Sequence, residues 1–429
     1  MITLAISLSL CLSILLQDSA VQDEKFQGWA RKSESENKVS LELVSRRFQA
    51  EGKPDLWLVG VAHIADASFY EEVGLLLDEM DIVLYESVRP TGSRPPAGLT
   101  DEERIATTMK SMDFVADVAM KSTIDAGALP ETIEDVFSNA ALIDSRLSVW
   151  VEDASVDAWG RPYSIQIDGE NNTIAFWCFG SDGKVGGDGS AKDLVVSRTI
   201  EFRDDALEED KQKGMQEDLA DILGLEFQLE ALSYASPNWF CSDLTIGEVE
   251  EKLIEQGADS AILGIITGEA FAAKIASGMM KLIPLLDALV GGGIRETARL
   301  LMIEMLSMDG ADQMLEGIEP ELARVIIVER NTEVLGDIAA TIEIVEDVSS
   351  IGVLYGAGHM KDLAERIHTL FGYSPVEDRW IISMHVNPND SLLNENDLNR
   401  MRFALQYQMH KASEAKKSSE KDDVKAEDN

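Results

Sequence analysis

The sequence predicts an α/β protein in which two βαβ halves form a mixed sheet with flanking helices, interrupted by a small inserted α+β domain. Two observations predict this fold. Apolar runs near the two ends of the chain, Leu56–Val59 and Ile351–Tyr355, each stop at a Gly-x-x-His motif, at Gly60–His63 and Gly356–His359. A helical pattern and a second apolar run then follow each motif. The second observation is that a segment of different character, rich in Gly and Asp, separates the halves.

Each half predicts the order strand, turn, helix, strand. In the first half Ser68–Met80 has apolar residues at helical spacing, and Ile82–Tyr85 is an apolar run that ends at Glu86. In the second half the stripe within Leu363–Leu370 predicts a helix, and Trp380–Met384 predicts a strand. Parallel βαβ units gather ligands at the carboxyl ends of their strands. We therefore expect both motif histidines in one crevice, with the glutamate reaching in from the neighbouring strand.

This set of side chains predicts a transition-metal site. His63, His359 and Glu86 provide imidazole nitrogens and a carboxylate, which suit Mn, Fe, Co or Zn. Three protein ligands and an open position would bind and acidify a water molecule. The alternative is that each histidine only caps a strand end through hydrogen bonds. The duplicated local context favours the metal site.

The order of these motifs resembles the TraB/GumN/Tiki family. The matching positions are Gly60–His63, Glu86, Glu329–Asn331 after a predicted strand at Val325–Val328, and Gly356–His359. A central segment, Leu225–Leu244, also looks like the family. The resemblance covers roughly residues 40–103 and 205–390.

The resemblance implies a fold of the EreA/ChaN/Tiki-like class and a metal-dependent protease or a related hydrolase. It implies that the two histidines pair with Glu86 and that Arg330 has a polar catalytic role, because its guanidinium can hold a carboxylate or an oxyanion. In a chain this acidic, Arg330 can equally pair with carboxylates. Some members of the family are known mainly as signalling modulators. This chain departs from the family at Val61–Ala62, where many relatives carry a hydroxyl residue.

Residues 104–203 predict the inserted domain. The spacing from Asp157–Tyr163 through Phe176–Gly189 to Lys192–Leu194 resembles the C-terminal domain of type II secretion major pseudopilins, and a predicted helix over Ile105–Ile124 extends the similarity upstream. The domain lacks the long apolar N-terminal helix through which pseudopilins polymerise. We therefore expect a docking or substrate-orienting role.

A Gly-rich loop in this domain predicts a calcium site. Five glycines between 180 and 189 let the backbone curl, and Asp182, Asp188 and Asp193 supply hard oxygen ligands, with Ser190 as a further candidate. In the pseudopilins the corresponding loop holds calcium. The loop is not an EF-hand, because no Glu closes a twelve-residue loop. The alternative is a Gly- and Asp-rich hairpin loop without metal.

Composition limits the partners and the location. The formal charge of −41 argues against nucleic acid, whose phosphates would be repelled, although a saline habitat also explains acidic surfaces. Residues 2–16 form an apolar segment before Ala20, which predicts a signal peptide, or else an uncleaved anchor, and an extracytoplasmic location. We expect no other membrane span. The predicted division is a signal peptide at 1–20, the first half at 21–103, the inserted domain at 104–203, the second half at 204–395 and a charged tail at 396–429.

Three functions remain open at this point. The first is a secreted or periplasmic metal-dependent hydrolase, with a peptidase favoured, that acts on a peptide or small molecule. The second is a non-enzymatic protein that binds a peptide or ligand in the same crevice. The third is a metal-free, esterase-like hydrolase in which His63 acts as the general base.

Overall fold

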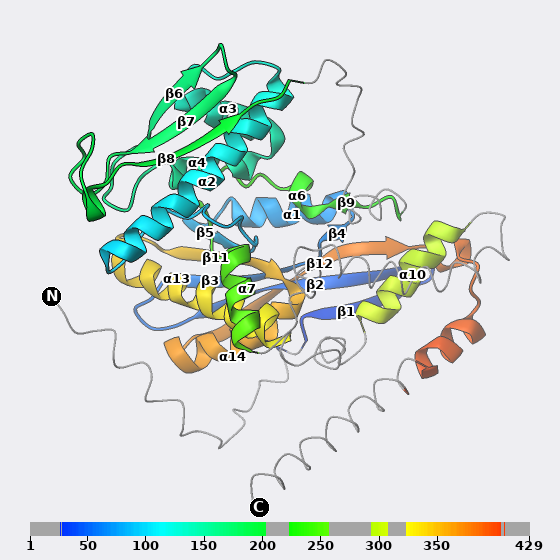
Figure 1. Cartoon of the computed structure of the whole chain (residues 1–429). Coiled ribbons are helices and arrows are strands. Elements are labelled where there is room, and N and C mark those ends of the chain that lie inside the picture. The colour runs from blue at the N-terminus through cyan, green and yellow to red at the C-terminus, as the bar shows by residue number, and fades with distance from the viewer. Residues whose placement is uncertain are drawn as a thin grey trace, which may run out of the picture.

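The main body is built on a mixed, seven-stranded sheet. The computed structural model describes residues 26, 28–202, 223–256, 293–307, 323–404 and 407. The strand order is β1-β2-β3-β11-β5-β10, and β12 pairs with β2 (Figure 1). The strands are β1 Ala30–Ser35, β2 Lys38–Gln49, β3 Asp55–Val61, β5 Ile82–Tyr85, β10 Trp239–Cys241, β11 Ser350–Gly356 and β12 Ser374–Val386. The prediction of a mixed α/β protein is confirmed. The predicted signal peptide and most of the predicted tail lie outside the described residues.

Both predicted βαβ units are present in the sheet. Strand β11 lies between β3 and β5 and is parallel to both, so β3, helix α1 (Ala67–Leu77) and β5 form a crossover around it. Strand β12 is antiparallel to β2, which is antiparallel to β3. It follows that β12 runs in the same direction as β11, and that helix α14 (Met360–Phe371) connects two strands of one orientation.

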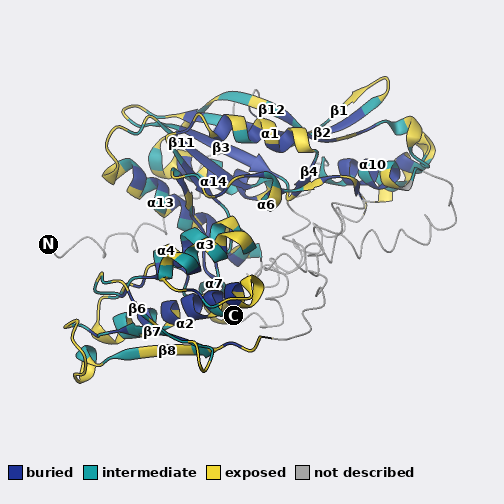
Figure 2. Ribbon diagram, turned by 90° about the horizontal axis from the view of Figure 1, so that it is seen from above, coloured by how far each residue is buried: buried dark blue, intermediate teal, exposed yellow. Residues whose placement is uncertain are grey.

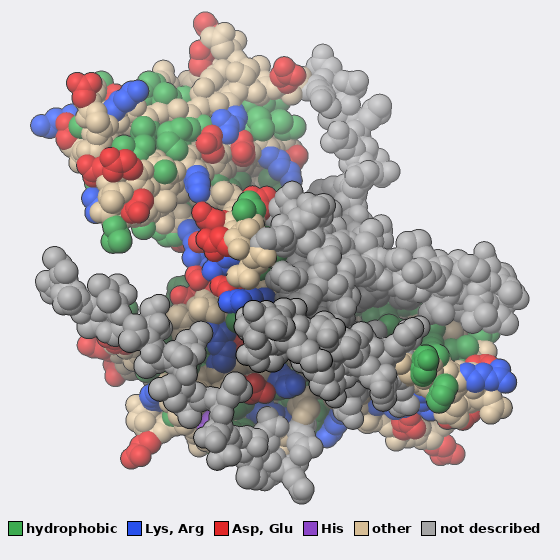
Figure 3. Space-filling view, turned by 60° about the horizontal axis from the view of Figure 1, so that its bottom comes forward, with side chains coloured by type: hydrophobic (Ala, Val, Ile, Leu, Met, Phe, Trp, Pro, Cys, Tyr) green, Lys and Arg blue, Asp and Glu red, His purple; other side chains and the backbone are tan. Residues whose placement is uncertain are grey.

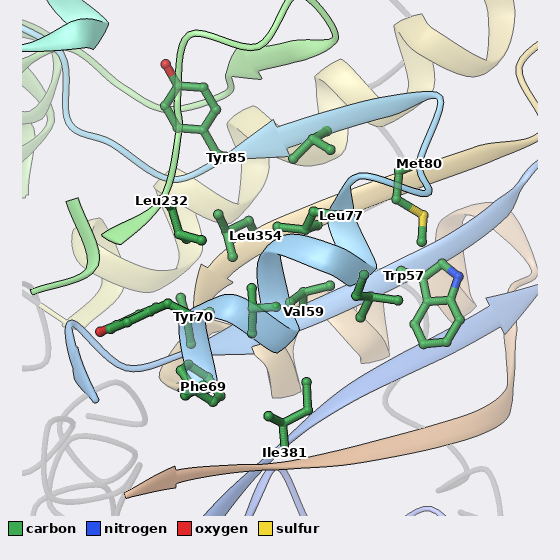
Figure 4. Close-up of a cluster of buried hydrophobic side chains, with 14 of the residues drawn as sticks. Trp57, Val59, Phe69, Tyr70, Leu77, Met80, Tyr85, Leu232, Leu354 and Ile381 are labelled. Carbon is green, nitrogen blue, oxygen red and sulfur yellow. The ribbon is translucent and has the colours of Figure 1, made fainter. Parts of the chain in front are cut away.

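Alternating strand residues form two hydrophobic cores, one on each face of the sheet. Trp57 and Val59 of β3 pack with α1 on one face (Figure 4). Leu56 and Leu58 of the same strand pack on the other face with α14 and α13 (Arg330–Ile344). The central strands β2, β3 and β11 are therefore mostly buried, whereas β1 is partly exposed, as Figure 2 shows. Helix α10 (Ile294–Leu306) packs against β2 and β12 in a further cluster.

The inserted domain has its own core of helices packed on a three-stranded antiparallel sheet (Figure 1). Its long first helix begins at a capping box, in which Thr100 and Glu103 satisfy each other's backbone amides, and ends at the left-handed Gly127. Met112, Phe176 and Val196 are buried between the two layers. The elements are α2 Asp101–Ala126, α3 Ile133–Ile143, α4 Ser145–Ala154, β6 Ser164–Asp168, β7 Thr173–Cys178 and β8 Leu194–Thr199.

The predicted strand at Val325–Val328 is wrong. Arg324–Glu329 forms a π-helical segment that continues directly into α13. A short apolar run is compatible with either a buried strand or a helix, and here tertiary packing decides. Val325 is buried against Leu244 and Val249, whereas Val328 is exposed.

Acidic and basic side chains both reach the surface among the described residues. On the face shown in Figure 3, acidic side chains interleave with Lys and Arg. Within the described ranges, no helix combines the length and the apolar character needed to cross a membrane.

Candidate functional site

Four neighbouring parallel strands each end near a polar side chain. Leu354 of β11 pairs with both Val59 of β3 and Tyr85 of β5, and β10 pairs with β5, so the carboxyl ends of the strands lie together. The polar side chains that follow the strand ends are His63, His359, Glu86 and Asp243. The first three are the residues that the sequence predicts at this edge.

Glu86 lies at the centre of a buried ion-pair network. Nη2 of Arg330 is 2.6 Å from Glu86 Oε1 and also 2.6 Å from Asp243 Oδ2, while Nε of Arg330 donates to Asp243 Oδ1 at 2.9 Å. The backbone amide of Gly356 donates to Glu86 Oε2 at 2.5 Å. Asp243 is fully buried and Arg330 is 6% exposed. One guanidinium therefore holds two carboxylates in fixed positions.

The network keeps Glu86 ionised. Burial alone raises the pKa of this carboxyl, but the positive charges of Arg330 and His359 outweigh it and hold the pKa well below its usual range. Burial lowers the pKa of Arg330, and the charges of Asp243 and Glu86 raise it well above its usual value. A carboxylate that stays charged in a buried position can bind a cation.

His359 is buried and directed at Glu86. Its Nδ1 lies 2.8 Å from Oδ1 of Asn331. The Asn331 amide nitrogen donates to the His359 carbonyl and to Asp362, so the amide oxygen faces the ring and His359 Nδ1 carries the proton. Nε2 lies 3.4 Å from Glu86 Oε1. An unprotonated Nε2 would turn its lone pair toward this carboxylate oxygen, so a proton on Nε2 or a nearby cation would stabilise the arrangement.

His63 has a similar hydrogen bond in a different setting. Its side chain is exposed, and its Nδ1 lies 3.3 Å from Oε1 of Gln228, in helix α6 (Gln228–Ala231). The Gln228 amide nitrogen donates to the hydroxyl of Tyr234 at 3.0 Å, which leaves the amide oxygen to accept from His63 Nδ1–H. The Nε2 of His63 is therefore free to bind a ligand from the solvent side. When His63 is protonated, its charge also lowers the pKa of Glu86.

The donor chemistry of this edge fits a transition metal. Metal-binding histidines usually donate their second ring N–H to an oxygen, and both motif histidines do so here. Two ligands of a tetrahedral site with bonds of about 2.0–2.2 Å lie roughly 3.3–3.6 Å apart, and the 3.4 Å between His359 Nε2 and Glu86 Oε1 agrees with this. Across the part of the chain that is described, however, no group of three His, Cys, Asp or Glu side chains is arranged to hold a metal ion. Arg330 also occupies one side of Glu86.

The sequence indicates the position of Arg330 but not its partners. Its predicted alternative, pairing with carboxylates, is the arrangement present. The sequence alone predicts no role for Asp243, Gln228 or Asn331, although all three lie within segments that carry the family resemblance. Asp243 and Gln228 each follow the end of a short strand, and Asn331 is next to Arg330 in the chain. These positions are the sequence features that could have indicated a role in the site.

The predicted calcium loop is only partly organised as a cation site. Gly180, Gly183, Gly186, Gly187 and Gly189 all have positive φ, as the tight curl requires. Asp182 accepts from the amide of Lys184, and Asp188 is exposed. Oδ2 of Asp193 accepts from the amide of Gly186 at 2.9 Å, whereas its Oδ1 is buried without a hydrogen-bond partner.

That unpaired oxygen is suited to calcium, but Arg161 opposes the site. Its guanidinium donates to the carbonyls of Gly180 and Ser181, which are the kind of oxygens that calcium would need. Among the residues described, Asp182, Asp188 and Asp193 do not form an assembled metal site.

Comparison with known proteins identifies one region. A family model for type II secretion system protein G matches residues 101–197, which covers most of the predicted inserted domain. This confirms the resemblance of that domain to pseudopilins. Neither the curated proteins nor the solved structures provide a significant match to the chain.

Proposed function

We propose that this chain is an extracytoplasmic, metal-dependent hydrolase, with peptides as the favoured substrates. The observation that carries the proposal is the convergence of His359 Nε2 and Glu86 Oε1, 3.4 Å apart, at the shared carboxyl edge of the parallel strands. His63 lies on the exposed side of the same edge, where a substrate can approach. The order of the motifs supports a likeness to the TraB/GumN/Tiki family and its EreA/ChaN/Tiki-like fold, and the pseudopilin-like domain supports an extracytoplasmic location.

The surroundings of each residue suggest a separate role for it in the proposed site. His63 and His359 would hold Mn, Co, Fe or Zn through Nε2, with Glu86 as the oxygen ligand or as the base beside it. A metal ion bound there would lower the pKa of water and polarise a carbonyl. Arg330 keeps Glu86 charged and in place, because it is committed to Glu86 and Asp243. Arg330 would therefore act as a positioning residue for Glu86.

The metal-free, esterase-like hydrolase with His63 as the general base is the other enzymatic candidate, and one contact favours a site without metal. With a proton on Nε2, His359 and Glu86 form an imidazolium–carboxylate pair that needs no metal ion. Such a pair would support acid–base hydrolysis of an ester. The non-enzymatic binding protein is the third candidate, because the same edge can hold a ligand without turnover.

Activity measurements on the full chain separate these candidates. Purified protein would be freed of metal with a chelator, supplied in turn with Mn, Co, Fe or Zn, and assayed against fluorogenic peptides and esters. We expect peptide hydrolysis that depends on the metal and falls by at least about 100-fold in Glu86→Gln, with loss in His63→Ala and His359→Ala.

His368→Ala is the matched control, because His368 bonds to the carbonyl of Tyr373 away from the site. Equal activity with and without chelator would contradict the metal-dependent proposal. Peptide binding without turnover under every metal would favour the binding protein.

For the inserted domain we propose calcium binding centred on Asp193. Its buried, unpaired Oδ1 supports the proposal, and Asp182 and Asp188 would complete the site. Calorimetric titration with Ca²⁺ would test this, with Asp193→Asn expected to weaken binding. Identical titrations of the two proteins would contradict it.

A further inference from the structure

The inserted domain reaches the candidate site through one arginine. Arg146, in helix α4, donates to the hydroxyl of Ser87 at 2.8 Å. Ser87 is the residue next to Glu86 in the chain. The same guanidinium lies 5.9 Å from the ring centre of Tyr234, within the range of a cation–π contact. The domain is thus in contact with the body of the protein at the end of β5.

This contact continues toward His63 through side chains of the main body. The hydroxyl of Tyr234 accepts from Gln228, and Gln228 accepts from His63 Nδ1. Tyr234 is also held edge-on by Tyr85, with ring centres 4.9 Å apart. The orientation of Tyr234 therefore influences which way the Gln228 amide points.

The docking surface is built to hold Arg146 in one position. Asp144, which also belongs to the inserted domain, forms an ion pair with the guanidinium of Arg146. Trp150 lies against Arg146 at 5.3 Å and against Arg89 of the main body at 5.6 Å. Arg89 in turn pairs with Asp153 of α4 at 3.1 Å. These contacts join helix α4 of the inserted domain to Arg89 of the main body, beside the candidate site.

We propose that Arg146 is a positioning residue, through which the inserted domain holds Tyr234 and Gln228 so that His63 keeps its proton on Nδ1 and its lone pair on Nε2. The inference is independent of any bound metal. Its consequence for catalysis rests on the proposed function.

The test measures the tautomer of His63 directly. Protein with ¹⁵N-labelled histidine would be examined by NMR at a fixed pH near 8.5, without metal or substrate, and the His63 signals assigned from their loss in His63→Asn. In the wild type we expect the Nδ1–H form. In Arg146→Gln we expect the ratio of Nδ1–H to Nε2–H to fall about two- to fivefold, the equivalent of one cation–π contact. Arg146→Lys should restore part of the ratio.

Arg198→Gln is the matched control, because Arg198 binds Asp113 and Asp117 within the inserted domain itself. It should leave the ratio unchanged.

If Arg146→Gln unfolds the inserted domain, Ser87→Ala removes the hydrogen-bond partner of Arg146 from the main body instead. An unchanged ratio in Arg146→Gln and Ser87→Ala, together with a changed ratio in Gln228→Leu, would overturn the role of the inserted domain. An unchanged ratio in Gln228→Leu would overturn the whole chain of contacts. If the tautomer ratios change as expected but the protein shows no hydrolysis, the proposed function is contradicted and the positioning role of Arg146 is not.

Discussion

The two Gly-x-x-His strand ends share a sequence pattern but have different surroundings. His359 is 5% exposed, and its ring contacts Asn331, Glu86 and the edge of Tyr355. His63 is exposed, and Gln228 is its hydrogen-bond partner. In both histidines, Nδ1 faces a side-chain amide oxygen, so Nε2 is the ring nitrogen that can bind a ligand or exchange a proton. One histidine is thus part of the core, and the other is at the surface of the same site.

The difference arises from the elements that follow each strand. After β11 a 3-10 turn at Ala357–His359 leads into α14, and Asn331 of α13 donates a hydrogen bond to the His359 carbonyl. After β3 the chain forms the short strand β4 (Ile64–Ala65), which pairs with β9 (Glu226–Phe227) and leaves His63 at the edge. A repeated motif therefore predicts where a side chain lies along the sheet, but not how deeply it is buried.

The largest expected effect is a loss of stability when the buried ion-pair network beside His359 is broken. Arg330→Met would leave the carboxylates of Glu86 and Asp243 buried without their cation. Breaking a buried ion pair in this way costs about 3–5 kcal/mol. Urea unfolding followed by circular dichroism would measure the loss.

Arg366→Met is the control, because Arg366 pairs with Asp362 near the surface and should contribute less than about 1 kcal/mol. Equal losses in the two variants would show that the network around Glu86 is not a buried ion-pair network.

The sequence predicts the edge of the sheet where the site lies, because strand ends and helices follow from apolar periodicity alone. It does not predict the carboxylate partner of Arg330. That partner, Asp243, follows a three-residue strand whose pairing with β5 depends on contacts distant in sequence. The π-helical segment Arg324–Glu329 is predicted as a strand for the same reason, because Val325 becomes buried only when α7 (Ile246–Glu255) packs beside it. The sequence gives no measure of the different burial of the two histidines.

The second prediction compares the histidines themselves. Removal of His359 leaves the buried amide of Asn331 without one partner, so His359→Ala should destabilise the fold by about 1–3 kcal/mol. His63→Ala changes an exposed side chain and should remain within about 0.5 kcal/mol of the wild type. Thermal and urea unfolding of both variants would measure this. Equal destabilisation would contradict the assignment of one buried and one exposed histidine.

The third prediction concerns the amides that hold the two rings. If both histidines bind one metal ion, Asn331→Leu and Gln228→Leu should each weaken Co²⁺ binding by about 10–100-fold. The larger loss is expected for Asn331, which is fully buried. Competition against a chromophoric chelator would give both affinities. A loss in one variant alone would show that the second histidine is not a ligand.

The smallest effect is a pH dependence. The pKa of Glu86 is lower in the folded protein than in the unfolded chain, so its stabilisation is present above the ordinary glutamate pKa of about 4.3 and disappears as the pH falls toward the folded value. The urea midpoint of the wild type should therefore decrease more between about pH 5 and pH 3 than that of Glu86→Gln. Glu71→Gln, which changes an exposed glutamate, should follow the wild type. Parallel curves for wild type and Glu86→Gln would contradict the depressed pKa.

X-ray absorption at the cobalt edge tests the central claim most directly. The full chain would be loaded with one equivalent of Co²⁺ in excess Ca²⁺, which competes with Co²⁺ for carboxylate-only binding. We expect two imidazole nitrogens in the first shell of the cobalt at about 2.0–2.2 Å, and the loss of one imidazole in His63→Ala and in His359→Ala. A shell of oxygen atoms alone, unchanged in both variants, would contradict a metal centre shared by the two strand ends.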